Sequence, residues 1–154
     1  MLIDNPQARQ IVLARLARLG IGTDRILFAA NADYDHVIAR LQAADLGLDT
    51  FPYNGHTTTS DALWAGLPVV TAKGSHFASR VSESLLTALG VPELVADDHN
   101  AYVDLAVALA EDHERLRAIR EKIAANRTTA PLFDTVRFTR YLERAFEMMA
   151  DRAR

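Results

Sequence analysis

The sequence predicts an α/β fold in which a mostly parallel sheet carries helices on both faces. Two observations predict it. Short apolar runs that fit buried strands alternate with longer segments whose apolar residues recur at helical spacing. One of these strands is followed by a loop of turn residues and hydroxyl side chains that leads into a helix. Folds of this kind bind ligands beyond the carboxyl ends of their parallel strands.

The first half of the chain should contain two helices and two strands. The segment 7–19 places aliphatic residues among arginines and is closed by Gly20, which predicts a helix. The run Ile26-Leu27-Phe28 predicts a short buried strand within residues 25–30. A helix over residues 36–44 and a strand over residues 46–50 follow.

The second half continues the alternation. Strands are expected at residues 68–72 and 93–96, which are short and apolar. No internal repeat or long linker interrupts the pattern, so we expect residues 1–154 to form a single domain. The helices expected in this half cover residues 59–65, 77–88, 100–111, 114–126 and 135–150.

Composition bounds the function. Apolar residues make up 49% of the 154 residues, charged residues make up 24%, and the net charge is −3. This balance is ordinary for a globular domain and gives no case for a nucleic-acid or membrane surface. The chain has no cysteine, which excludes disulfides and thiolate chemistry and fits a reducing cytoplasm. Its first residues lack the pattern of a signal peptide.

The loop after the strand at 46–50 is the best candidate site. Pro52, Asn54 and Gly55 supply turn chemistry, and four hydroxyl residues then open a helix. Thr58 and Asp61 have the spacing of a capping box. A glycine-bearing loop that feeds a helix N-terminus presents free N–H groups and suits a phosphate. The alternative is an ordinary well-capped helix.

Several sequence words resemble one enzyme family. Leu48-Asp49-Thr50, Gly55-His56-Thr57-Thr58, the run from Asp61 to Gly66, and Pro131-Leu132-Phe133 stand in order with similar spacing. They resemble the C-terminal, UDP-sugar-binding lobe of O-GlcNAc transferases of glycosyltransferase family 41, of the SPINDLY-like and bacterial type. A related fucosyltransferase branch shares the run from Asp49 to Tyr53 but lacks the histidine, so His56 favours the UDP-sugar branch.

The resemblance implies a Rossmann-like lobe of a two-lobed (GT-B) glycosyltransferase and assigns roles to its residues. Gly55, His56, Thr57 and Thr58 would bind the diphosphate of the donor, and Asp61 would accept hydrogen bonds from the ribose. These assignments agree with hydrogen-bond chemistry. Backbone amides and hydroxyls donate hydrogen bonds to phosphate oxygens, and a carboxylate accepts hydrogen bonds from the two hydroxyls of a diol. The alternative for Asp61 is that it caps its own helix.

The resemblance also implies a contact to the base. Arg40 stands where the family has an arginine that reaches the uracil, the alternative being a solvated helix arginine. The family has a histidine three residues before that arginine. Val37 occupies that position here, and His36, four residues before Arg40, takes its role only if the backbone shifts by one residue. The family lysine just upstream is absent.

A metal site is the other possibility for this region. Asp33 and Asp35 form an Asp-x-Asp pair, which holds a divalent metal on the donor diphosphate in an unrelated glycosyltransferase architecture. The pattern is common by chance. We therefore expect no metal site and no cofactor other than the donor substrate.

The expected function is the donor-binding part of an enzyme that transfers N-acetylglucosamine from UDP-GlcNAc to protein Ser or Thr hydroxyls. The rival is a non-catalytic module that binds a nucleotide or a protein. The family lysine of the catalytic site and the acceptor-binding lobe are expected to precede Met1, so the chain alone should not transfer sugar.

The same reasoning predicts an incomplete sheet. If the segment 26–28 is the third strand of the lobe and 46–48 the fourth, Met1-Leu2-Ile3 is the tail of the second and the first is absent. In the doubly wound order 3-2-1-4-5-6 this leaves two strands beside a gap. We expect the chain to close this gap by pairing the third strand with the fourth, by exchanging elements with a second copy, or by both. Unpaired edges invite association, so a homodimer is expected.

Overall fold

The computed structural model describes residues 5–152, which divide into two compact units, up to Val37 and from Ile38 onward. The boundary between the two units falls within the helix that spans residues 34–42. The first unit contains α1 (Pro6–Arg18), a 3-10 turn (Thr23–Arg25) and the start of α2 (Tyr34–Gln42). Asn5 caps α1 by accepting the Ala8 N–H at 3.1 Å, and Pro6 takes the first helical position.

The sheet lies in the second unit and is wholly parallel. It has three strands in the order β1-β2-β3: β1 (Gly47–Leu48), β2 (Val69–Ala72) and β3 (Val95–Ala96). Gly47 is in register with Val69, and Thr71 with Val95. The central strand β2 is buried at all four positions, which requires cover on both faces of the sheet.

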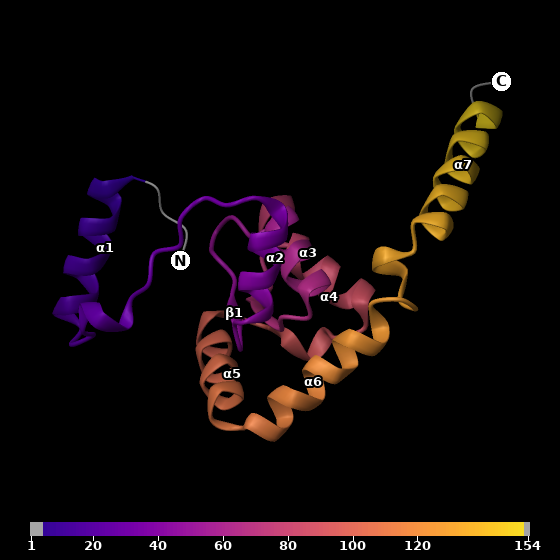
Figure 1. Cartoon of the computed structure of the whole chain (residues 1–154). Coiled ribbons are helices and arrows are strands. Elements are labelled where there is room, and N and C mark those ends of the chain that lie inside the picture. The colour runs from indigo at the N-terminus through magenta and orange to yellow at the C-terminus, as the bar shows by residue number, and fades with distance from the viewer. Residues whose placement is uncertain (1–4, 153–154) are drawn as a thin grey trace. The chain divides into compact units, whose positions relative to one another are not determined.

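Helices supply that cover. The connections β1–α3–β2 and β2–α4–β3 run in one direction across the sheet, so right-handed crossovers place α3 (Thr57–Ala65) and α4 (Val81–Leu89) on one face. The helix α5 (His99–Glu111) packs on β2 and β3, and Figure 1 shows it apart from α3 and α4. The predicted α/β fold with helices on both faces is confirmed.

The core of the second unit joins the sheet to α3, α4, α5 and α6 (His113–Asn126). Leu63, Leu86, Leu89 and Leu109 are fully buried there. Gly66 and Gly90 end α3 and α4 in the left-handed conformation, with φ of 87° and 81°. The last helix, α7 (Thr135–Arg152), has no buried residue.

The strand predicted at residues 26–28 is not found in the structure. Residues 26–28, predicted as a strand, belong to no strand of the sheet, and Ala29 forms only a single bridge. A strand needs a neighbour over several residues, and the sheet joins only β1 with β2 and β2 with β3. The expected strand tail Met1-Leu2-Ile3 lies outside the described residues. None of the described helices is both long and apolar enough to span a membrane.

Candidate functional site

Asp49 anchors the loop that leaves β1. Its side chain is only 9% exposed. One carboxylate oxygen accepts the backbone N–H groups of Thr50 at 2.9 Å and Gly55 at 2.8 Å, and the other accepts the hydroxyl of Thr71 on β2 at 2.6 Å. A single buried carboxylate therefore ties both ends of the loop 50–55 to the central strand.

Further bonds fix the loop from outside. Asn54 donates its backbone N–H to the Ala78 carbonyl at 2.9 Å and its side-chain amide to the Thr50 carbonyl at 3.1 Å. Ser82 of α4 donates to the Gly55 carbonyl at 3.0 Å and lies 3.1 Å from the Thr59 hydroxyl. The loop therefore enters α3 in a defined conformation.

Gly55 is required where the loop meets α3. A Cβ atom at this position would overlap the hydroxyl oxygens of Thr58 and Thr59, and Thr59 is buried. The absence of a side chain lets the backbone approach the first turn of the helix closely. The first helical bond of this turn runs from the Ser60 N–H to the His56 carbonyl, so the preceding N–H groups have no partner within the helix.

His56 occupies the N-cap position of α3. Its ring stacks on Tyr53, with centroids 4.9 Å apart and planes 13° apart, and contacts the edge of Phe77 at 5.9 Å. Its Nε2 is buried and has no hydrogen-bond partner among the described residues, and the same holds for the Asn54 Oδ1. Buried polar atoms normally have partners, so these two atoms mark an unfilled polar site.

A small hollow lies between this loop and α2. Its volume is about 180 Å³, and Gly55 and Thr58 line it together with Leu41, the residue after Arg40. The hollow therefore brings the last turns of α2 to the same place as the loop and the first turn of α3.

A second cavity lies at the same edge of the sheet. It measures about 390 Å³ and is lined by residues that follow all three strands, including Phe51, Lys73 and His99. Lys73 Nζ lies 2.6 Å from Asp97 Oδ1, and this hydrogen-bonded ion pair raises the pKa of Lys73 and lowers that of Asp97. Phe51 packs edge-on against His99 and Tyr102. The Tyr102 hydroxyl donates a hydrogen bond to the Asp49 carbonyl at 3.1 Å. The pKa of Tyr102 is raised, mainly because its side chain is partly buried and also because of the negative charge of Asp49.

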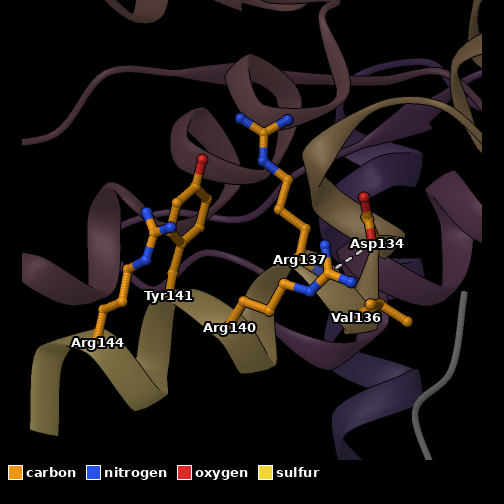
Figure 2. Close-up of a pocket in the computed structure, with 6 residues that line it drawn as sticks. All are labelled: Asp134, Val136, Arg137, Arg140, Tyr141 and Arg144. Carbon is orange, nitrogen blue, oxygen red and sulfur yellow. Dashed lines mark hydrogen bonds between the residues drawn. The ribbon is translucent and has the colours of Figure 1, made fainter. Parts of the chain in front are cut away.

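Another hollow, of about 340 Å³, runs along α7. Figure 2 shows the side chains of Arg137, Arg140 and Arg144 extending from the helix beside Tyr141. Asp134 accepts the Arg137 N–H at 2.9 Å and so caps the helix, and the Arg137 guanidinium lies 5.4 Å from the centre of the Tyr141 ring. No residue that the sequence predicts for the site lines this hollow.

Comparison with known proteins decides the family. The model of glycosyl transferase family 41 matches residues 2–142, which is most of the chain. The chain belongs to this family.

Similar family members come from animals, plants and bacteria. A UDP-N-acetylglucosamine–peptide N-acetylglucosaminyltransferase of Caenorhabditis elegans is 44% identical over 80% of this chain, and the SPINDLY protein of Oryza sativa subsp. japonica is 41% identical over 92%. The structure of an O-GlcNAc transferase mutant from Thermobaculum terrenum matches 94% of the chain with a TM-score of 0.88 and 32% identity. The chain spans only 11%, 15% and 28% of these three proteins, respectively.

The structure brings most of the family 41 site residues predicted from sequence into one region. Gly55, His56, Thr57 and Thr58 form the turn into α3, and Asp61 follows in its second turn. The predicted capping box is wrong, because α3 begins at Thr57 and Asp61 is its fifth residue. Arg40 lies on α2 next to a residue that lines the small hollow.

The other predicted positions lie in the first unit. Asp33 Oδ1 accepts the backbone N–H of His36 at 3.0 Å and lies 2.6 Å from its Nδ1. Both hydrogen bonds lower the pKa of Asp33, and the bond from the His36 backbone N–H has the larger effect. Asp33 thus caps the start of α2. Across residues 5–152, no three His, Asp or Glu side chains gather as a metal site would require.

Sequence reasoning missed three contributors. Asp49 stands in a quoted sequence word, but its buried bonds to Gly55 and Thr71 depend on the fold. The sequence indicates only turn chemistry for Asn54, and it does not show that the Oδ1 atom is buried without a partner among the described residues. The third is Arg120 of α6, which bonds to the end of α2 from 75 or more residues away. Nothing in the local sequence signals such distant contacts.

Proposed function

We propose that this chain provides the donor site of a family 41 glycosyltransferase that transfers N-acetylglucosamine from UDP-GlcNAc to protein Ser or Thr hydroxyls. The observation that carries the proposal is the buried Nε2 of His56, which has no partner among the described residues at the start of α3. Family membership supports the reaction, and the names of all three similar proteins state this activity or this class of enzyme.

The diphosphate of the donor would lie at the turn into α3. The N–H groups of the first turn and the hydroxyls of Thr57 and Thr58 point to an anion site, strengthened by the positive end of the helix. Tyr53 is 63% exposed, so its ring can turn into solvent and give a phosphate oxygen access to His56. In the reaction these N–H and hydroxyl groups would stabilise the negative charge of the leaving UDP.

The nucleoside would extend from the diphosphate toward α2. Asp61 would accept from the ribose hydroxyls and Arg40 would contact the uracil, as the family resemblance implies. The small hollow of about 180 Å³ can hold only part of a nucleotide, so the rest would remain open or meet another part of the enzyme. His36, in the first unit, keeps the role near the nucleoside that the family resemblance implies.

No metal or cofactor is needed in this proposal, because the amides, hydroxyls and His56 neutralise the diphosphate directly. We further propose a cytoplasmic location, with which the cysteine-free composition is compatible. The chain by itself should not transfer sugar. A homodimer is also proposed, since β1 is an edge strand of the described sheet and its Leu48 is 61% exposed.

Calorimetry with UDP tests the site. We expect binding that is equal with EDTA and with manganese, and that His56→Ala or Thr58→Ala weakens by about 1–3 kcal/mol, as for lost hydrogen bonds to a charged group. His113→Ala and Thr128→Ala, which alter exposed residues elsewhere, serve as matched controls. Unchanged affinity in both site variants would refute the site. Binding that requires manganese would implicate Asp33 and Asp35, and no binding at all would favour a protein-binding module.

A further inference from the structure

Arg120 holds the C-terminal end of α2 from a distant helix. Its Nη1 donates to the carbonyl oxygens of Ala44 at 2.7 Å and Asp45 at 3.3 Å, and its Nη2 donates to that of Gln42 at 3.2 Å. Carbonyls at a helix C-terminus have no partner within the helix and carry its partial negative charge. One guanidinium therefore satisfies the end of α2 and the turn that leads into β1.

Arg120 is itself well anchored. It lies on α6 between Ile119 and Ile123, both buried in the core, and its own side chain is partly buried. The planar guanidinium offers several donors in a fixed arrangement, which suits three carbonyls on one short segment. The position of the α2 terminus is thus set by the core of the second unit.

The segment that Arg120 holds carries Arg40. Gln42 is two residues after Arg40, and Leu41 packs against the core and lines the hollow beside Gly55 and Thr58. Two bonds close this end of the helix, from Ala43 N–H to the Ala39 carbonyl and from Ala44 N–H to the Leu41 carbonyl, each 3.2 Å long. Leu41 and Arg120 therefore fix the last turn of α2 from two sides.

We propose that Arg120 is a positioning residue for recognition of the donor base. By holding the end of α2 it keeps Arg40 beside the nucleobase, and it makes no contribution to the diphosphate site at α3. This inference rests on the proposed function, because it takes Arg40 as the group that contacts uracil.

The test compares a ligand that has a base with one that has none. We expect Arg120→Ala in the full chain to weaken UDP binding about tenfold, the scale of one misplaced hydrogen bond to a charged group. Binding of inorganic pyrophosphate should stay within about twofold, because Arg120 bonds to the end of α2 and not to the loop or to α3. Arg120→Lys should recover only part of the UDP affinity. Arg117→Ala is the matched control, since Arg117 lies on the same helix, is 71% exposed and faces Glu121 at 3.9 Å.

Two further measurements separate positioning from general damage. The double variant Arg40→Ala/Arg120→Ala should bind UDP no more weakly than Arg40→Ala. Both substitutions remove the same contact, the one between Arg40 and the base, so their effects should not add. Amide exchange at Ala43 and Ala44 should speed up in Arg120→Ala and not in Arg117→Ala.

Three outcomes would overturn the inference. If Arg120→Ala weakened the binding of UDP and of pyrophosphate equally, Arg120 would be a general support of the fold. If the affinity of Arg120→Ala for UDP were unchanged, Arg120 would have no role in positioning Arg40. Failure of the unaltered chain to bind either ligand would contradict the proposed function as well, whereas normal UDP binding with an unaffected Arg120→Ala variant contradicts only this inference.

Discussion

Asp49 is the residue on which the loop depends most. Its carboxylate serves the Gly55 N–H and the Thr71 hydroxyl, and Thr71 is fully buried. Asp49→Ala would leave these donors buried and unsatisfied, so we expect it to lower the free energy of unfolding by about 2–4 kcal/mol. Asp49→Asn keeps one oxygen and should cost less, about 1–2 kcal/mol.

Urea unfolding measures both Asp49 variants. Asp104→Ala is the control, since Asp104 is exposed on α5 and should change the free energy of unfolding by less than about 0.5 kcal/mol. A stability equal to that of the unaltered chain in Asp49→Ala would show that the carboxylate does not hold the loop.

The residue scale also shows what sequence can and cannot predict. Gly55, His56, Thr57 and Thr58 are contiguous, so one sequence word was enough to bring them together. Asp49 and Thr71 are 22 residues apart and meet only because β1 and β2 are neighbours in the sheet. A contact that depends on strand order has no local signature in the sequence.

At the scale of elements, the turn into α3 requires glycine. In Gly55→Ala the added methyl would overlap the hydroxyls of Thr58 and Thr59, and Thr59 cannot move freely because it is buried beside Ser82. We expect a loss of about 1–3 kcal/mol in stability, the usual cost of overpacking, together with weaker UDP binding. Thermal unfolding and calorimetry measure the two effects.

Gly22→Ala is the matched control for that variant. Its Cβ would meet only the end of the flexible Asp24 side chain, in the first unit. Comparable losses of stability in the two variants would contradict a specific role for Gly55.

Helices were predicted well from sequence because their periodic apolar faces are local. The segments predicted at 7–19, 100–111 and 114–126 correspond to α1, α5 and α6. The strand at 26–28 was wrong because a short apolar run forms a strand only where a neighbouring strand pairs with it, and none of the three described strands does so. The start of α3 was misjudged because several hydroxyl residues in a row offered competing caps, whereas the helix already begins at Thr57, the first of them, and His56 takes the N-cap position.

At the scale of the whole molecule, exposed apolar groups predict self-association. The edge strand β1 exposes Leu48, and α7 exposes Phe138 and Phe146 at 65% and 60%. Light scattering at micromolar concentration should show a homodimer, which Leu48→Lys or Phe146→Glu shifts toward monomer by placing a charge on these surfaces. A stable, monodisperse monomer of the unaltered chain would reject this prediction.

The central claim is that UDP binds where the loop from β1 enters α3. The most direct measurement is a nuclear magnetic resonance titration of the ¹⁵N-labelled chain with UDP in the presence of EDTA. The account predicts shifts that concentrate on the amides of Gly55, His56 and Thr57 and on the end of α2 around Arg40. Shifts confined to the arginines of α7, or no shifts at millimolar UDP, would contradict it.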